Sequence, residues 1–149
     1  SRFRGRWMRH GLWSPDRQLR LFDRRHAHWA GRNPHDAVEA DGSVRHFREP
    51  LLHDPYRSDS DYFSTREWYT DLSAREMFAE GRRAGAWAPM GHALGHLAKA
   101  LILNPGWLDG RAGLLLAWRG AGHSWMKYSK LRILAEGGQP VGNAPRGRG

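Results

Sequence analysis

Short apolar runs alternate with turn-forming residues over the first 55 positions of the chain. The runs are RLF, AHW, AVEA, SVRHF and PLLH, and Gly, Pro, Asn and Asp separate them. Runs of this length between turn formers predict β-strands. Asp41 and Gly42 lie between AVEA and SVRHF. They predict a two-residue hairpin turn there, because glycine accepts a positive φ.

The apolar period lengthens after about residue 58 and predicts a first helix. Ser58 with Asp61 three residues later resembles a capping box, which opens a helix by satisfying free backbone N–H groups. Gly81 lies where such a helix should end. Apolar positions recur between these ends at helical spacing: Tyr62, Tyr69, Leu72 and Ala79.

A second helix is expected from near Pro89 to the NPG sequence at 104–106, where proline and glycine disfavour continuation. Its apolar stripe contains Met90, Leu94, Leu97 and Leu101. His92 and His96 are four residues apart in GHALGH, a spacing that zinc sites use. Neither the glutamate of a metalloprotease motif nor a third ligand accompanies them. We therefore favour helix packing, through close contact at Gly91 and Gly95, over a metal site.

A third helix should start after Asp109, a good N-cap residue, and run to about Ala135. One face carries Leu114, Trp118, Ala121, Trp125 and Tyr128, and another carries Arg119, His123, Lys127 and Lys130. The favoured interpretation is an ordinary helix with a buried apolar face and a solvated basic face. A helix lying on a membrane surface ranks second, and a nucleic-acid-binding helix ranks third.

The amino-acid composition indicates the kind of partner and excludes some kinds of site. The chain has 24 Lys and Arg against 15 Asp and Glu, a formal net charge of +9, which implies attraction to an anionic partner. The absence of cysteine excludes disulfides and thiolate zinc sites. No apolar run approaches the roughly 20 residues that a membrane-spanning helix needs, and no signal peptide is evident. The residues 136–149 are rich in Gly, Pro and Arg and predict a disordered tail.

His35 and Asp36 lie in a predicted turn after Pro34, in the stretch RNPHDAVEADG. The short side chain of an aspartate in a turn usually forms hydrogen bonds with nearby backbone groups. Taken alone, this pair therefore indicates a structural role in the turn rather than a catalytic role. The motifs around the pair favour the opposite interpretation.

Those motifs form an ordered series along most of the chain. They are GRWMRHG at 5–11, WSPD at 13–16, RLFDR at 20–24, Trp29, His35 with Asp36, LLH at 51–53, GWLDGRAGLLLAW at 106–118 and MKYSKL at 126–131. This series resembles the second half of bacterial family 2 glycosyltransferases. The closest branch adds sugars to lipopolysaccharide core and related glycans. The resemblance extends to about residue 134.

The resemblance implies an α/β chain, the C-terminal part of a GT-A-like fold, with short mixed strands in residues 1–55 and three helices in 58–135. Residues 1–135 would form the acceptor-side portion of the enzyme. The family's donor-side Asp-x-Asp motif has no counterpart here. The sequence DSD at 59–61 has the same letters, but it follows the acceptor-side motifs and lies at a predicted helix start. With Ser1 in place of methionine, we expect a piece of a longer protein that is inactive alone.

The resemblance also assigns roles. Asp36 occupies the position of the catalytic base in an inverting transfer, and the other substrate-binding positions are His35, Arg20, Arg24, Trp29 and His53. The implied partners are a nucleotide-sugar donor and a glycan or lipid-linked acceptor, with a divalent metal (Mg²⁺ or Mn²⁺) in the full-length enzyme. No metal ligand is assigned in this chain.

The expected location is cytoplasmic, at the inner face of the cytoplasmic membrane, and no nucleic-acid partner is expected. The alternative is a small basic module without chemistry, which binds nucleic acid or an anionic membrane surface.

Overall fold

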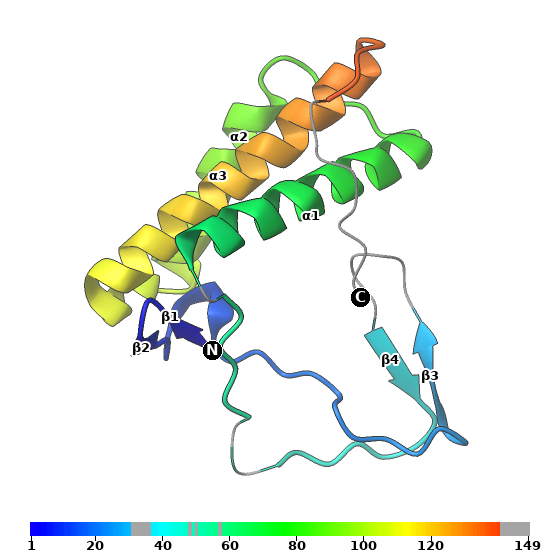
Figure 1. Ribbon diagram of the computed structural model, residues 1–149, viewed down its shortest axis with the longest axis vertical. Helices are drawn as coiled ribbons and strands as arrows, with labels where there is room; N and C mark the ends of the chain where they lie inside the picture. Colours follow the sequence, from blue (N-terminus) through cyan, green and yellow to red (C-terminus); the bar gives the residue numbers. More distant parts are fainter. Residues whose placement is uncertain (31–36, 48, 50, 57, 141–149) are drawn as a thin grey trace.

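The computed structural model describes residues 1–30, 37–47, 49, 51–56 and 58–140. These residues form a small mixed α/β structure with three helices, α1 (Asp59–Ala79), α2 (Ala88–Ala98) and α3 (Gly110–Ala135), and two small antiparallel sheets (Figure 1). Helix α3 packs against both α1 and α2. The predicted α/β class with three helices is confirmed.

Each sheet is a single pair of strands. β1 (Arg2–Phe3) pairs with β2 (Arg6–Trp7), and β3 (Ala27–Ala30) pairs with β4 (Ala37–Ala40). The extended chain between β2 and α1 carries the β3–β4 pair away from the helices (Figure 1).

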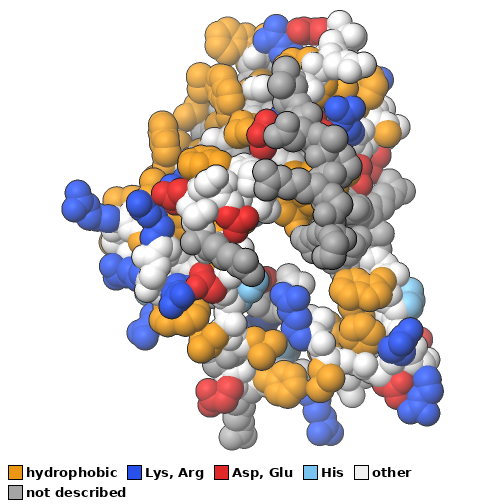
Figure 2. Space-filling model, in the orientation of Figure 1, with side chains coloured by type: hydrophobic (Ala, Val, Ile, Leu, Met, Phe, Trp, Pro, Cys, Tyr) orange, Lys and Arg blue, Asp and Glu red, His pale blue; other side chains and the backbone are white. Residues whose placement is uncertain are grey.

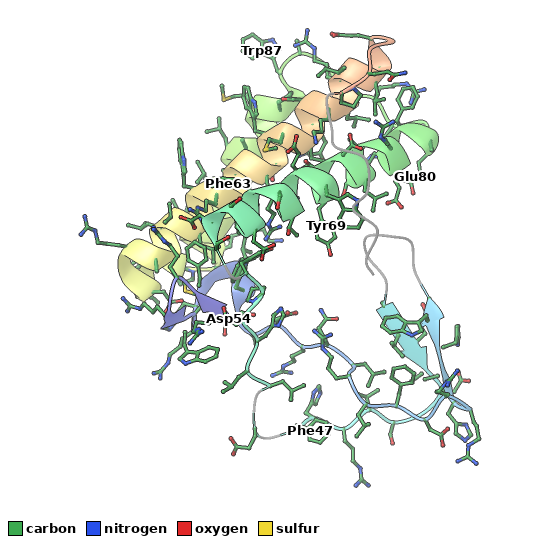
Figure 3. The ribbon with its side chains drawn as sticks, viewed as in Figure 1. Phe47, Asp54, Phe63, Tyr69, Glu80 and Trp87 are labelled. Carbon is green, nitrogen blue, oxygen red and sulfur yellow. The ribbon has the colours of Figure 1, made fainter. Side chains whose placement is uncertain are left out.

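The predicted hairpin at Asp41 and Gly42 is wrong. AVEA forms β4, but its partner is the preceding AHW run, and Asp41 closes that ladder by donating its N–H to the His26 carbonyl at 2.8 Å. The SVRHF and RLF runs are not strands, and neither are residues 51–53 of the PLLH run. Their apolar side chains, such as Phe47 and Leu52, are exposed (Figure 3). A strand needs a continuous ladder of backbone hydrogen bonds, and the described chain gives these runs only the single bond from Arg2 N–H to the His53 carbonyl.

Both predicted ends of α1 are confirmed. The Ser58 hydroxyl accepts a hydrogen bond from the Asp61 N–H at 3.0 Å. At the other end Gly81 adopts a φ of 83°, and the Arg82 N–H donates to the Met77 carbonyl at 2.9 Å. This is the Schellman arrangement, which favours glycine because of the left-handed backbone.

The second helix begins where expected, with Pro89 in its first turn, but the α-helix ends at Ala98, before the predicted stop at 104–106. The chain continues as a π-helical turn, η2 (Lys99–Leu103), and a short 3₁₀ helix, η3 (Gly106–Asp109), leads into α3. The predicted apolar stripe is not a buried face, because Met90 and Leu94 are exposed. Helix α2 packs against α3, but this packing leaves the two side chains open to solvent.

The histidines of α2 serve packing, as favoured, but by a different route. Gly91 and Gly95 have open space where a Cβ would lie, so they make no close helix contact. His96 instead covers Gly120 of α3, whose added Cβ would fall 2.1 Å from His96 Nε2. His92 stacks on the Tyr128 ring with centroids 3.5 Å apart. Within the described residues, no group of three or more His, Asp or Glu side chains is arranged to hold a metal ion.

Helix α3 departs from the predicted faces, although Ala121 of the apolar face is buried and Tyr128 packs against the core. Trp118 is 68% exposed, whereas Lys130 is only 7% exposed. The Lys130 ammonium donates to the Glu67 carbonyl at 3.0 Å, which pairs the buried charge with a backbone acceptor. Arg119 lies over the Tyr62 ring at 4.8 Å and donates to Asp59 at 3.0 Å. The favoured interpretation of a buried tryptophan face and a solvated basic face is therefore wrong.

The buried core lies where α1 and α3 meet. It contains Ala74, Met77, Ala84 and Leu131, with Phe78, Ala88, Tyr128 and Leu134 packed against it. None of the helices in the described part of the chain is both long enough and apolar enough to cross a membrane.

Candidate functional site

A cavity of about 190 Å³ lies between residues 8–13 and the three helices. Four polar side chains line it, one from each of these segments: His10, Arg66 of α1, His96 of α2 and His123 of α3. The rest of the lining includes Leu12, Trp13, Tyr62, Leu116 and Ala117. The cavity therefore combines an apolar wall with a cluster of basic groups.

Asp109 attaches the N-terminal segment to the start of α3. The backbone N–H groups of Arg9 and His10 donate to Asp109 Oδ2 at 2.9 and 2.8 Å, and His10 Nδ1 lies 3.0 Å from Oδ1. Asp109 precedes α3 as predicted, but its side chain makes no cap hydrogen bond. Its carboxylate instead serves a segment about 100 residues away.

The charge of Asp109 follows from these contacts. Burial raises the pKa of its carboxyl, but the hydrogen bonds from the His10 ring and from the backbone of His10 and Arg9 lower the pKa more, so that it falls below its usual value. The ionised carboxylate accepts a hydrogen bond from Nδ1 of His10.

Three glycines let the backbone segments approach closely beneath this contact. Gly11 has a φ of 78°, and a Cβ on it would lie 3.1 Å from the Cα of Gly106. A Cβ on Gly113 would lie 1.7 Å from the Gly106 carbonyl oxygen. Side chains at these positions would push residues 8–13 away from η3 and α3 and open the cavity.

Arg66 is the permanent cation of the cavity. Its guanidinium lies over the rings of Tyr62 and Tyr56, at 5.3 and 5.9 Å from their centroids. Burial raises the pKa of both phenols, while Arg66 opposes the rise. The two phenols therefore stay protonated, and the arginine keeps its full charge without a carboxylate in the cavity lining.

The histidines beside Arg66 are held in the neutral form. Burial, and then the charges of Arg66 and Lys127, lower the pKa of His123 to about 4. Burial, and then Lys99 and Arg66, also lower the pKa of His96. Among the described residues, Arg66 Nε and His123 Nδ1 are buried without a hydrogen-bond partner. The cavity thus holds a positive potential and two unused polar atoms.

The described residues predicted from the sequence do not line this cavity. Asp36 and His35 are outside the described residues. Arg20, Arg24, Trp29 and His53 are exposed and none of them lines the cavity. Trp29 is on β3 with its ring against the edge of Phe22, at 6.3 Å between centroids.

His53 is the predicted residue nearest to the N-terminal strand. Its carbonyl accepts a hydrogen bond from the Arg2 N–H at 2.8 Å, and Arg2 also forms an ion pair with Asp54. This contact brings the LLH segment beside β1, at the start of the GRWMRHG motif.

Sequence reasoning missed His10, Arg66, Asp109 and His123 as members of one site. His10 belongs to the GRWMRHG motif and Asp109 belongs to the GWLDGRAGLLLAW motif. Membership of these motifs was the one sequence signal that could have pointed to the two residues. Their contact was not inferable from spacing, because 99 residues separate them.

No family model matches the chain, and no solved structure is significantly similar to it. The assignment of a function therefore depends on the residues and contacts described above.

Proposed function

We propose that this chain is the acceptor-side portion of a family 2 glycosyltransferase. The enzyme would transfer a sugar, with inversion, from a nucleotide-sugar to a glycan or lipid-linked acceptor in the synthesis of lipopolysaccharide or another cell-surface polysaccharide. The observation that carries the proposal is the ordered series of motifs between Gly5 and Leu131.

The contact between Asp109 and His10 supports this proposal. It joins Asp109 of the GWLDGRAGLLLAW motif to the backbone of Arg9 and His10 in the GRWMRHG motif. The contact gives a structural reason for an aspartate in the later motif. Gly113 belongs to the same late motif, and its position admits no side chain. These motif residues would shape the acceptor side of the enzyme.

The proposed chemistry is a single displacement. The Asp36 carboxylate takes the proton of an acceptor hydroxyl while that oxygen attacks the anomeric carbon. The bond between this carbon and the diphosphate breaks, and the leaving group keeps the electron pair. Arg20, Arg24 and His53 are the side chains proposed to face the diphosphate, whose developing charge must be balanced.

The divalent metal expected for the full-length enzyme is not assigned to this chain. The described residues contain no group of three or more His, Asp or Glu side chains that fits a metal ion. Metal ligands would have to come from outside these residues, and the mechanism above routes no step through a metal.

A lipid-linked acceptor would require the enzyme to work at a bilayer surface. Exposed apolar side chains on or beside α2, η2, η3 and α3 support this location: Trp87, Met90, Leu94, Ile102, Leu103, Trp107, Leu114 and Trp118. Figure 2 shows hydrophobic side chains gathered along this edge of the helices, and Trp87 projects from it (Figure 3). With a net charge of +9, such a surface suits the anionic inner face of the cytoplasmic membrane.

The same surface favours one form of the alternative function, a basic module without chemistry. Arg119 and Lys130, which would have to face the phosphates of a nucleic acid, are engaged inside the structure. The exposed tryptophans suit a membrane better than a nucleic acid, because the side chains of these two cations are largely withdrawn from solvent.

Sugar transfer by the complete gene product tests the proposal. The protein is assayed with a panel of radiolabelled nucleotide-sugars and a membrane extract as acceptor, and Asp36→Asn is compared with Asp41→Asn. We expect transfer by the wild type and the Asp41 variant, and at least a hundredfold lower rate for Asp36→Asn. Normal turnover of Asp36→Asn would remove Asp36 from the role of base, and vesicle binding without any transfer would favour the module.

A further inference from the structure

We propose that the cavity between residues 8–13 and the three helices binds a phosphate group, held by Arg66 and His123. None of the described residues assigned to sugar transfer lines this cavity, and the proposal stands whether or not the proposed function is correct.

The first support is convergence. Arg66, His96 and His123 come from three different helices, and His10 from the N-terminal segment, yet all four line one cavity of about 190 Å³. Arg66 and His96 are close enough to His123 to lower its pKa. The Tyr56 and Tyr62 rings fix the guanidinium, so little freedom remains to be lost when a ligand binds.

The second support is that the cavity supplies donors and no acid. Its lining includes no Asp or Glu, and both oxygens of the adjacent Asp109 already contact Arg9 and His10. In the described part of the chain, Arg66 Nε and His123 Nδ1 are buried without partners. An anion in the cavity would balance the positive potential that Arg66 and Lys127 create at His123.

The third support concerns the kind of anion. A guanidinium beside imidazoles presents N–H groups from several directions, which matches the oxygens of a tetrahedral phosphate. The volume equals about six water molecules at roughly 30 Å³ each, enough for a phosphate and part of an attached group. The walls formed by Leu12, Trp13 and Leu116 suit the apolar portion of an organic phosphate.

Nuclear magnetic resonance of the His123 ring provides the test. Inorganic phosphate is titrated into the protein at constant ionic strength against chloride. We expect saturable binding in the millimolar range and a rise in the pKa of His123 by at least about one unit, because a nearby anion favours the imidazolium. Chloride should leave the pKa at about 4. No phosphate-dependent change up to about 50 mM, or an equal change with chloride, would overturn the proposal.

Variants of two arginines on α1 make the test specific. Arg66→Gln should weaken phosphate binding at least about tenfold, whereas Arg75→Gln, which removes an exposed arginine paired with Asp71, should not change it. Arg66→Lys keeps a positive charge and should bind more weakly than the wild type but better than Arg66→Gln. If Arg66→Gln does not fold, the phosphate affinity of Arg66→Lys provides the test. Unchanged affinity in a folded Arg66 variant contradicts the assignment.

Three ligands distinguish the sources of the phosphate group. Inorganic phosphate, uridine diphosphate and a short-chain phosphatidic acid below its micelle concentration are compared by calorimetry. Tightest binding of the nucleotide assigns the cavity to a donor-type diphosphate, and tightest binding of the lipid assigns it to a lipid phosphate. Equal affinities assign it to the phosphate group alone. Acetate is the control for carboxylates, and equal binding of acetate would overturn the choice of phosphate.

Discussion

The backbone N–H of His10 donates to Asp109 Oδ2 at 2.8 Å, and its ring Nδ1 lies 3.0 Å from Oδ1 of the same carboxylate. One buried aspartate at the start of α3 thereby holds a segment that is 99 residues earlier in the sequence. Residues 8–13 form one wall of the phosphate-binding cavity that we propose, so this contact determines whether the cavity exists.

Replacing Asp109 should therefore destabilise the protein. Asp109→Ala removes three acceptor contacts of a charged group and should lower the free energy of unfolding by about 3 kcal/mol, as urea denaturation would measure. Asp109→Asn keeps an acceptor and should lose less. Asp16→Ala, at an exposed position, is the control and should change the stability by less than about 0.5 kcal/mol. Equal effects at the two positions would contradict the role of Asp109.

Asp109 also predicts the direction of an acid effect. Its pKa is lower in the folded state than in the unfolded state, so the unfolded chain binds more protons in acid. The stabilisation is present above the usual carboxyl range and is lost as the pH falls below about 4 through the folded-state value. Asp109→Asn should show a smaller loss of stability over this range in urea titrations. An unchanged acid profile in the variant would show that Asp109 does not contribute.

Glycine 113 offers a sharper structural test, because α3 contains a matched control. The Cβ of Gly113→Ala would lie 1.7 Å from the Gly106 carbonyl oxygen, so the variant should lose on the order of 3 kcal/mol or more, or fail to fold. Gly122→Ala meets nothing within 4 Å and should gain up to about 1 kcal/mol from its helix propensity. Similar thermal stabilities of the two variants would contradict the packing of η3 against α3.

His123 should make the protein less stable in mild acid. Its pKa is about 4 in the folded state against 6.5 ordinarily, so protons bind preferentially to the unfolded chain between these values. Stability should be full above about pH 6.5 and fall, by up to about 3 kcal/mol, as the pH drops to about 4. His123→Asn should reduce this slope, whereas His28→Asn, at an exposed position on β3, should not. An identical slope in His123→Asn would place the titration elsewhere.

The exposed tryptophans predict binding to membranes. The protein should float with vesicles that contain anionic phospholipid at low salt and bind less as salt rises. Trp118→Glu should reduce this binding about tenfold, because Trp118 is 68% exposed on α3. Trp29→Glu is the matched control, since Trp29 is 69% exposed but lies on the β3–β4 hairpin. Equal losses in both variants would argue against a specific membrane-facing surface.

Local signals in the sequence were sufficient for the ends of the helices. Ser58 and Gly81 mark α1 through hydrogen bonds within a few residues, and Asp109 marks the start of α3 by its position. Such signals depend on neighbouring backbone groups alone, so the rest of the fold does not change them.

Long-range features were beyond these signals. Periodicity separated the tryptophan and basic faces of α3 but did not show which face meets α1 and α2. Lys130 is buried because the Glu67 carbonyl is within reach of its ammonium, a contact across 63 residues. The cavity has the same origin, since Arg66 and His123 belong to helices whose packing no local pattern specifies.

The anomeric configuration of the transferred sugar tests the proposed function most directly. The complete gene product is incubated with an α-linked nucleotide-sugar and acceptor, and proton magnetic resonance of the product gives the configuration of the new bond. A single displacement, with Asp36 as base, predicts a β-linked product that is absent when Asp36→Asn replaces the wild type. An α-linked product, or no sugar-bearing product from any nucleotide-sugar, would contradict the assignment as an inverting glycosyltransferase.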